Sequence, residues 1–173
     1  MFQYLQGTKK DILFFSYGKS LVLEGFTDSN FAACQDTHRS TSGYIFKLGG
    51  ATISWRSRKQ RSVATSTLEA EYMACTQAAK QHIWLKRALT ELGYHNIPSA
   101  LSCDNIGSID LSENPRIRDR SKHIDIAYHF IHELVEIGAL TILHIPGKLN
   151  AADLCTKALP GPQHESLKSL IMG

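Results

Sequence analysis

Four acidic residues stand at the ends of stretches that the sequence predicts as strands and helices. They close a first strand, lie in the first turns of a long helix, follow a fourth strand and open a late helix: Asp28, Glu71, Asp104 and Asp153. Carboxylates that converge on one cleft suit Mg²⁺, which prefers oxygen ligands in octahedral geometry. Two such ions about 4 Å apart activate a water and stabilise the leaving oxygen of a phosphodiester. The set therefore predicts a metal-dependent phosphodiesterase.

Each acid is a weak signal by itself. An Asp at a strand end or a helix start is more often a turn former or a cap. Asp153 is the most ambiguous, because Asn150 and Asp153 also have the spacing of a capping arrangement. The prediction of a metal site depends on the set and not on any single residue.

Two glutamates compete for the helical position in this set. Ser66 and Glu69 fit a capping box, in which the glutamate folds back on the start of the helix. Glu71 lies two residues further on, about 200° around the helix. It heads a stripe through Cys75 and His82 that should face the sheet, where an unpartnered carboxylate is costly. We therefore predict that Glu71 binds metal and that Glu69 caps the helix.

Positive charge is concentrated in two segments, although the formal net charge of the chain is only +3. The first segment contains Arg56, Arg58, Lys59 and Arg61, and the second contains Arg116, Arg118, Arg120 and Lys122. Clustered cations can neutralise the phosphates of a nucleic acid. Two solvated loops explain these runs equally well when the runs are taken alone.

The composition is that of one folded globular unit, with 173 residues of which 43% are hydrophobic and 20% charged. No stretch approaches the roughly 18 apolar residues of a membrane span, and the N-terminus lacks the order of a signal peptide. We therefore expect a soluble, intracellular protein without a membrane partner. The four cysteines lie far apart without a CxxC pair, so they indicate neither a zinc site nor a disulfide framework.

The first half of the chain predicts three strands and a long helix. Residues 21–28 form an apolar run, and residues 43–48 and 51–55 flank Gly49-Gly50, a dipeptide that supports a tight hairpin turn. Apolar residues then recur at intervals of three and four over residues 66–92. Three antiparallel strands and one amphipathic helix are expected.

The second half predicts two more strands among helices. The expected elements are a strand at 100–103, a short helix to about residue 111, a helix at 121–137, a strand at 140–145, a helix at 150–159 and a short helix around 164–171. Together the halves predict an α/β fold: a five-stranded mixed sheet, three strands antiparallel and then two parallel, flanked by helices. Ligands of such sheets gather near strand ends.

Seven short segments carry a further signal. They are Gly25-Phe26-Thr27-Asp28-Ser29-Asn30, Arg39-Ser40-Thr41-Ser42-Gly43-Tyr44, Ile53-Ser54-Trp55-Arg56-Ser57-Arg58-Lys59-Gln60, Ser66-Thr67-Leu68-Glu69-Ala70-Glu71-Tyr72, Cys103-Asp104-Asn105, Lys122-His123-Ile124-Asp125-Ile126 and Ala152-Asp153-Leu154-Cys155-Thr156-Lys157. In this order they resemble the motifs of ribonuclease H domains in copia-type LTR retrotransposon Pol polyproteins. The resemblance runs from about residue 21 to 160.

This resemblance implies a ribonuclease H-like fold and an endoribonuclease that hydrolyses the RNA strand of RNA/DNA hybrids during reverse transcription. It implies two Mg²⁺ ions, or Mn²⁺ in their place, held by the four acids, in agreement with the independent choice of Glu71. The family contacts the hybrid at positions that correspond here to Ser29, Asn30, Ser66, Thr67 and Asn105. The implied partners are the hybrid and the reverse transcriptase domain of the same polyprotein, in a cytoplasmic retrotransposon particle.

The resemblance also suggests a division of the chain. Residues 1–20 resemble the end of a reverse transcriptase, residues 21–160 form the ribonuclease H domain, and residues 161–173 form a helical tail. The basic segments are then expected to follow the hybrid backbone through Arg56, Arg58, Lys59, Arg116, Arg118 and Arg120.

One departure from the family concerns the loop before the last acid, where many ribonucleases H carry a histidine. The loop here, residues 146–150, has none. His144 is the nearest histidine, but it alternates with apolar residues as a strand residue does. Lys148 is a candidate replacement, as a cation near the scissile phosphate. Three other histidines lack the i, i+4 pairing of a zinc helix and are not predicted to bind metal: His123, His129 and His132.

Two other functions compete with this interpretation. Integrases and transposases use a related fold, but their last acid is a helical glutamate after two aspartates, whereas the glutamate here comes second. A ribonuclease H fold retained as a catalytically silent nucleic-acid-binding or scaffold domain is the stronger alternative, because an intact set of acids does not exclude a displaced loop.

Overall fold

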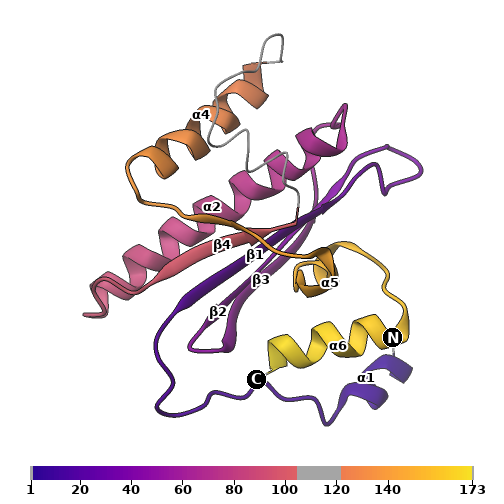
Figure 1. Ribbon diagram of the computed structural model, residues 1–173. Helices are drawn as coiled ribbons and strands as arrows, with labels where there is room; N and C mark the ends of the chain where they lie inside the picture. The colour runs from indigo at the N-terminus through magenta and orange to yellow at the C-terminus, as the bar shows by residue number, and fades with distance from the viewer. Residues whose placement is uncertain (1, 105–121, 173) are drawn as a thin grey trace.

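A five-stranded sheet in the order β3-β2-β1-β4-β5 forms the centre of the computed structural model, which describes residues 2–104 and 122–172 (Figure 1). The strands are β1 (Leu23–Asn30), β2 (Thr41–Leu48), β3 (Ala51–Lys59), β4 (Ser99–Cys103) and β5 (Ile142–His144). The first three pair antiparallel, whereas β1 with β4 and β4 with β5 pair parallel. The predicted mixed sheet is confirmed. The helix expected to reach about residue 111 lies outside the described residues.

The hairpin of β2 and β3 is longer than the sequence pattern predicted. β3 continues past Trp55 as far as Lys59, which pairs with Thr41 at the start of β2. The added residues are mostly charged or polar and exposed, so they lack the apolar alternation that marks a strand. Charged side chains are common on an edge strand, because they discourage pairing with another chain. Three cations of the first basic segment, Arg56, Arg58 and Lys59, therefore lie on an edge strand, and Arg61 follows its end.

Helix α2 (Thr67–Glu91) packs on one face of the sheet, and α4 (Lys122–Glu136) packs against α2 (Figure 1). The predicted stripe is buried, and its members include Glu71, Cys75, Ala78, His82 and Leu85. Its apolar members join the core formed with Leu23, Phe46 and Leu101. Full burial of one large apolar side chain stabilises a fold by about 2 kcal/mol, so this contact fixes α2 on the sheet.

The parallel pairing of β1 and β4 brings two of the predicted acids to the same end of the sheet. Phe26 is in register with Ser102. The residues two positions further along the chain are Asp28 and Asp104. Because side chains two residues apart in an extended chain point to the same side, the two carboxylates come together.

The helix predicted at 150–159 is much shorter in the structure. A 3-10 turn covers Gly147–Leu149, and α5 spans only Asp153–Thr156. The buried side chain of Asn150 donates to the carbonyl of Thr27 at 3.0 Å and accepts from the amide of Ala152 at 3.2 Å. These bonds hold the turn against β1, so Asn150 ends one turn and does not begin a long helix. Asp153 is nonetheless the first residue of α5, as predicted.

Two segments from opposite ends of the chain lie together below the sheet in Figure 1: α1 (Phe2–Thr8) with the strand-free stretch after it, and α6 (Gly161–Met172). The amide of Phe14 donates to the carbonyl of Met172 at 2.9 Å. Lys168 Nζ lies 3.3 Å from Asp11 Oδ2. The final helix begins earlier than predicted because Pro162 is tolerated in a first helical turn.

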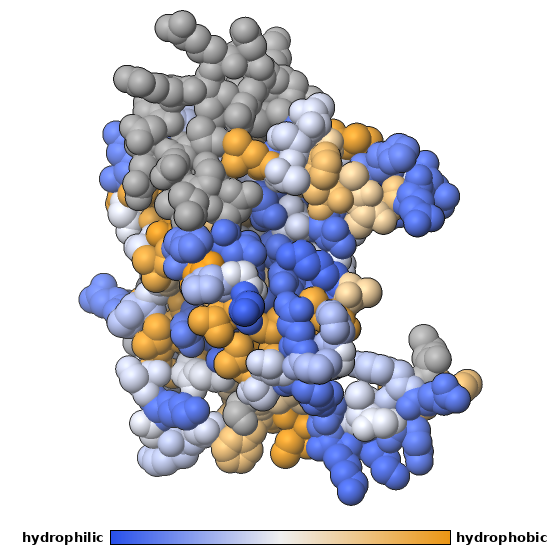
Figure 2. Space-filling view, turned by 45° about the vertical axis from the view of Figure 1, so that its right-hand side comes forward, coloured by the Kyte–Doolittle hydropathy of each residue, from blue (hydrophilic) through white to orange (hydrophobic). Residues whose placement is uncertain are grey.

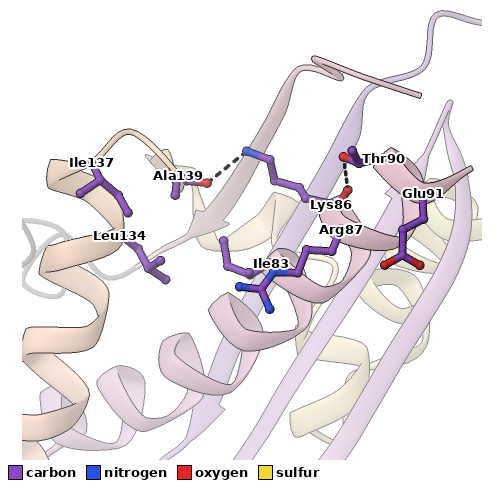
Figure 3. A pocket seen from close by; sticks show the side chains of 8 residues that line it. All are labelled: Ile83, Lys86, Arg87, Thr90, Glu91, Leu134, Ile137 and Ala139. Atoms are coloured by element: carbon purple, nitrogen blue, oxygen red, sulfur yellow. Dashed lines mark hydrogen bonds between the residues drawn. The ribbon is translucent and has the colours of Figure 1, made fainter. Parts of the chain in front are cut away.

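A groove of about 470 Å³ separates the C-terminal halves of α2 and α4 (Figure 3). Its lining residues include Ile83, Arg87 and Leu134, and Lys86 Nζ crosses it to donate to the carbonyl of Ala139 at 3.2 Å. None of the four predicted acids lines this groove. In the ranges 2–104 and 122–172, no helix combines the length and the hydrophobicity needed to cross a bilayer.

Candidate active site

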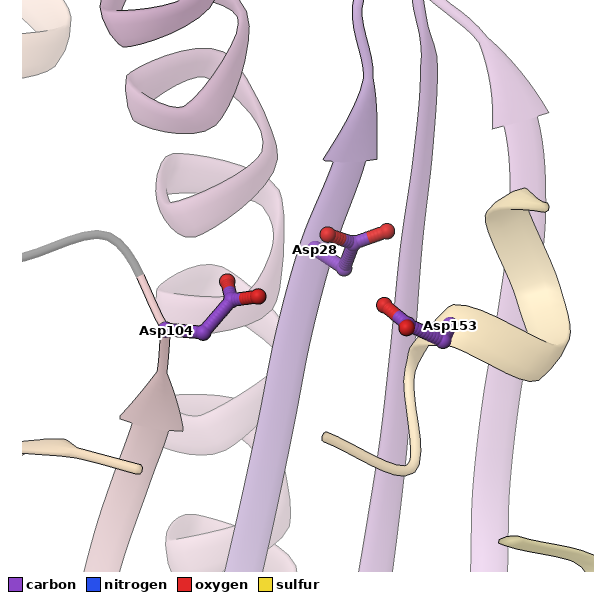
Figure 4. Close-up of side chains that lie close together, drawn as sticks. All are labelled: Asp28, Asp104 and Asp153. Carbon is purple, nitrogen blue, oxygen red and sulfur yellow. The ribbon is translucent and has the colours of Figure 1, made fainter. Parts of the chain in front are cut away.

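Three of the four predicted acids form one tight cluster. A carboxylate oxygen from each of Asp28, Asp104 and Asp153 lies within 4.8 Å of the others. The three side chains point toward one another from the end of β1, the residue after β4 and the start of α5 (Figure 4). Asp28 and Asp153 are buried, with exposed fractions of 1% and 4%, so their charges are poorly hydrated.

Glu71 adjoins this cluster from the first turns of α2. Its side chain is buried, and burial raises the pKa of its carboxyl to about 8, with the negative charges of Asp28 and Asp104 adding to the increase and contacts with Ser29 opposing it. Because the charges of Asp28 and Asp104 both act on the carboxyl of Glu71, this side chain lies close to the cluster. Glu71, and not Glu69, therefore faces the acids.

Glu69 has the structural role predicted for it, with one difference. Ser66 Oγ accepts a hydrogen bond from the amide of Glu69 at 3.1 Å, which caps α2. The carboxylate of Glu69 accepts from the amide and the hydroxyl of Thr65, at 2.7 and 2.6 Å, rather than from the amide of Ser66. Glu69 thus holds the chain that enters the helix.

Asp28 is the most enclosed acid of the cluster, and both of its oxygens have partners. Thr156 Oγ1 donates to Oδ2, and Lys157 Nζ lies 3.0 Å from Oδ1. Burial raises the pKa of Asp28 to about 6, although the hydrogen bond from Thr156 and the charge of Lys157 oppose the increase. The site is thus held together by neighbours from a segment more than a hundred residues away in the chain.

Lys157 is a site residue that the analysis of the sequence missed. Its ammonium lies 3.0 Å from Asp28 Oδ1 and 2.8 Å from Asp153 Oδ1, and so bridges two of the clustered acids. The spacing of four residues between Asp153 and Lys157 could have shown the pair, because residues at i and i+4 are neighbours on a helix.

Gly43 sets how closely α5 approaches the sheet. It pairs with Asp28 across β1 and β2. A Cβ at this position would lie 2.6 Å from Thr156 Cγ2 and 2.7 Å from Cys155 Cβ, closer than carbon atoms pack. The distance between Asp153 and Asp28 therefore depends on a position without a side chain.

The predicted substrate contacts lie in different surroundings, and some lie outside the described residues. Asn30 Nδ2 donates to the carbonyl of Thr156 at 3.1 Å, Ser29 is buried near Glu71, and Ser66 and Thr67 are exposed at the start of α2. Lys148 is exposed and follows Gly147, where an added Cβ would lie 3.0 Å from Asp104 Oδ2. Other predicted contacts lie outside the described residues: Asn105, Arg116, Arg118 and Arg120.

The first basic segment lines a groove of about 330 Å³ between β3 and α2. Its cations are Arg56, Arg58, Lys59, Arg61 and, from α2, Lys80. Lys59 Nζ also lies 2.9 Å from Cys34 Sγ, and the pKa of that thiol is lowered to about 7, first by this contact. Figure 2 shows one face of the molecule, on which hydrophilic and hydrophobic side chains lie side by side around the middle.

The donor set of the cluster fits a hard divalent cation. The three aspartates of the cluster offer carboxylate oxygens that already converge, and the adjoining Glu71 is a fourth carboxylate. Oxygen ligands of this kind are preferred by Mg²⁺ and Mn²⁺, whereas zinc sites use histidine and cysteine.

The structure agrees with the interpretation of His144 as a strand residue, because His144 is the last residue of β5 and is exposed.

Comparison with solved structures defines the class of fold. LC11-RNase H1, solved in complex with an RNA/DNA hybrid, covers 78% of this chain and 93% of its own, with a TM-score of 0.56 and 19% identity. The N-terminal RNase H domain of rv2228c from Mycobacterium tuberculosis covers 87% of this chain and 98% of its own, with a TM-score of 0.57 and 10% identity. The chain has a ribonuclease H-like fold.

Comparison of sequences identifies the relatives. No protein-family model matches the chain. The retrovirus-related Pol polyprotein from transposon TNT 1-94 of Nicotiana tabacum is 44% identical over 169 residues, which is 98% of this chain and 13% of the polyprotein. The Pol polyprotein from transposon RE1 of Arabidopsis thaliana is 38% identical, over 98% of this chain and 12% of that polyprotein. The chain is homologous to one short stretch of retrovirus-related Pol polyproteins from plant transposons, which confirms the resemblance found in the sequence.

Proposed function

We propose that this chain is an endoribonuclease that hydrolyses the RNA strand of RNA/DNA hybrids, with divalent metal ions held by Asp28, Glu71, Asp104 and Asp153. The observation that carries the proposal is the convergence of three carboxylates within 4.8 Å, with Glu71 beside them. A ribonuclease H-like fold and homology to Pol polyproteins support the same activity. We place this activity in the reverse transcription of a retrotransposon, inside a cytoplasmic particle and beside a reverse transcriptase domain.

The four acids are proposed as metal ligands, and Glu71 differs from the three aspartates in its protonation. When bound, two Mg²⁺ or Mn²⁺ ions supply an activated water and stabilise the charge on the leaving oxygen. Asp28, Asp104 and Asp153 provide oxygens from three different elements. Glu71 carries a proton at neutral pH in the metal-free protein, because its pKa is about 8, and has to lose that proton to bind a cation. Metal affinity should therefore rise with pH up to about 8.

The groove between β3 and α2 is the proposed track for one backbone of the hybrid. Four of its cations lie on β3 or α2 and Arg61 follows β3 closely, so they can contact successive phosphates from positions that the fold already fixes. Ser29 lies beside Glu71 and Asn30 contacts Thr156 of α5. With the exposed Ser66 and Thr67 at the start of α2, they are the proposed contacts with 2′-hydroxyl groups, which distinguish RNA from DNA. We extend the proposal to Asn105, Arg116, Arg118, Arg120 and Lys148 as further contacts with the hybrid.

A cleavage assay tests the proposal directly. A hybrid labelled on its RNA strand is incubated with the protein and Mg²⁺, next to the same RNA as a single strand and as an RNA duplex. We expect cleavage of the hybrid alone, and none with EDTA or with Asp28→Asn. Tight binding of the hybrid without any cleavage would instead support a catalytically silent binding domain.

A further inference from the structure

Lys157 occupies a position that a divalent cation would also need. Its ammonium contacts Asp28 Oδ1 at 3.0 Å and Asp153 Oδ1 at 2.8 Å, and both carboxylates belong to the cluster of converging acids. No other ion pair in residues 2–104 and 126–172 reaches this cluster. Lys157 is thus the positive charge that offsets these buried acids.

The contacts of Asp28 show why Lys157 and a divalent cation would compete for the same oxygens. One of its oxygens accepts from Thr156 and the other is bound to Lys157, so neither oxygen is without a partner. A cation that takes Asp28 as a ligand has to share or replace one of these contacts. Replacing the ammonium is favoured over replacing the hydroxyl, because two positive charges on one oxygen repel each other.

The side chain of Lys157 can also leave. It is 34% exposed, and Lys157 is the residue at which α5 ends and the chain becomes extended. A lysine stem with four carbons can move its ammonium to solvent by rotating its side chain alone. Asp28 and Asp153 are fixed on β1 and α5, so the lysine and not the acids would move.

We propose that Lys157 is a resident counter-ion of the acid cluster, which bridges Asp28 and Asp153 until a divalent cation displaces its ammonium. This inference depends on the metal site of the proposed function and adds a competitor that belongs to the chain itself. Two consequences follow. Lys157 stabilises the metal-free protein, and it weakens the apparent affinity for metal, because only the fraction of molecules with Lys157 displaced can bind.

Calorimetric titration with Mn²⁺ and Mg²⁺ tests the competition, using the parent chain, Lys157→Met and Lys157→Arg. If Lys157 bridges the acids in about 90% of metal-free molecules, Lys157→Met should bind metal roughly tenfold more tightly. Lys157→Arg retains a cation and should stay close to the parent. Lys168→Met is the matched control, because Lys168 also contacts two carboxylates, at 3.3 and 2.9 Å, but on α6 and away from the cluster.

Thermal unfolding gives an independent readout that does not involve activity. Without metal, Lys157→Met should melt at a lower temperature than the parent, and saturating Mn²⁺ should recover more of its stability than it adds to the parent. Labelling of the parent with an amine-reactive reagent should increase at Lys157, and not at Lys168, when Mn²⁺ is added. Circular dichroism at 10 °C shows whether each variant is folded before it is titrated.

The outcomes separate the two proposals. A parent chain that binds no divalent cation would contradict the metal site itself. A parent that binds metal in a way that Asp28→Asn abolishes, but with the same affinity in Lys157→Met, would overturn the role of Lys157 alone. Weaker metal binding by a folded Lys157→Met would also overturn it, because Lys157 would then be arranging the acids for metal and not competing with it.

Discussion

Two buried ionisable residues on the same stripe of α2 differ in their neighbours: one lies beside other charged groups and the other among apolar ones. Glu71 and His82 lie on the buried side of α2, about three turns apart. Glu71 adjoins Asp28 and Asp104, in a cluster that Lys157 bridges. His82 lies near the ring of Phe46, with 6.1 Å between ring centroids, and within the described residues neither of its nitrogens has a hydrogen-bond partner.

Burial drives both groups toward their neutral forms. It raises the pKa of Glu71 to about 8 and lowers that of His82 to about 4, with the charge of Lys86 lowering the latter further. Only Glu71 has other carboxylates beside it, with which its charged form could bind a cation. A shifted pKa on a buried stripe therefore indicates function only where converging partners accompany it.

The largest effect is expected from removing a charge at the acid end. Asp28→Asn should reduce hybrid cleavage by at least about 10³-fold, because losing one metal ligand costs several kcal/mol of transition-state stabilisation. Single-turnover rates at saturating hybrid and Mg²⁺ measure it. His82→Gln should cut at the parental rate if folded. If Asp28→Asn cleaved the hybrid at the parental rate, the acid cluster would have no more part in cleavage than His82 has.

An effect of comparable size separates the two glutamates of α2. Glu71→Gln should abolish cleavage, whereas Glu69→Gln should keep most of it, because glutamine still accepts the hydrogen bonds of the cap. The same single-turnover assay compares them, with melting temperatures as the control for folding. If Glu69→Gln is the inactive variant, the acid that serves the site has been misidentified.

Much of this comparison could be predicted from the sequence. Parallel strands end at one edge of a sheet, so Asp28 and Asp104 were expected to meet, and the helical period distinguished Glu71 from Glu69. Three features could not be predicted. The basic end of β3 has no apolar alternation. The late helix does not begin at Asn150, because the side chain of this residue is bonded to the distant Thr27. The contact of Lys157 with Asp28 joins positions that no local pattern links.

A smaller effect concerns stability and tests the other end of the stripe. Since the pKa of His82 falls from 6.5 unfolded to about 4 folded, its burial favours folding above pH 6.5 and loses that contribution as pH falls toward 4. His82→Leu should remove this loss, which amounts to about 2 kcal/mol at pH 5. Urea unfolding at pH 7 and pH 5 measures it. His144→Gln, at an exposed position, is the control and should unfold as the parent does at both values.

The smallest effect concerns one partner of Asp28. Thr156→Val removes a hydrogen bond to the carboxylate and should raise the pKa of Asp28 above about 6 by less than about one unit, because one such bond contributes roughly 1 kcal/mol. Carboxyl chemical shifts followed by NMR in the metal-free protein measure the pKa. Thr90→Val removes a comparable hydroxyl at the far end of α2 and should leave it unchanged. A fall in the pKa of Asp28 would contradict the stabilising role of Thr156.

Gly43 has a consequence for how related genes are surveyed. Transposon sequences accumulate substitutions, and a count of intact copies would naturally score the four acids. A copy with alanine at position 43 would pass that count, although its added methyl group meets Cys155 and Thr156 and forces α5, with Asp153, away from the sheet. The proposed activity thus depends on the absence of a side chain at position 43 as well as on the carboxylates, and a survey of the acids alone would count such a copy as intact.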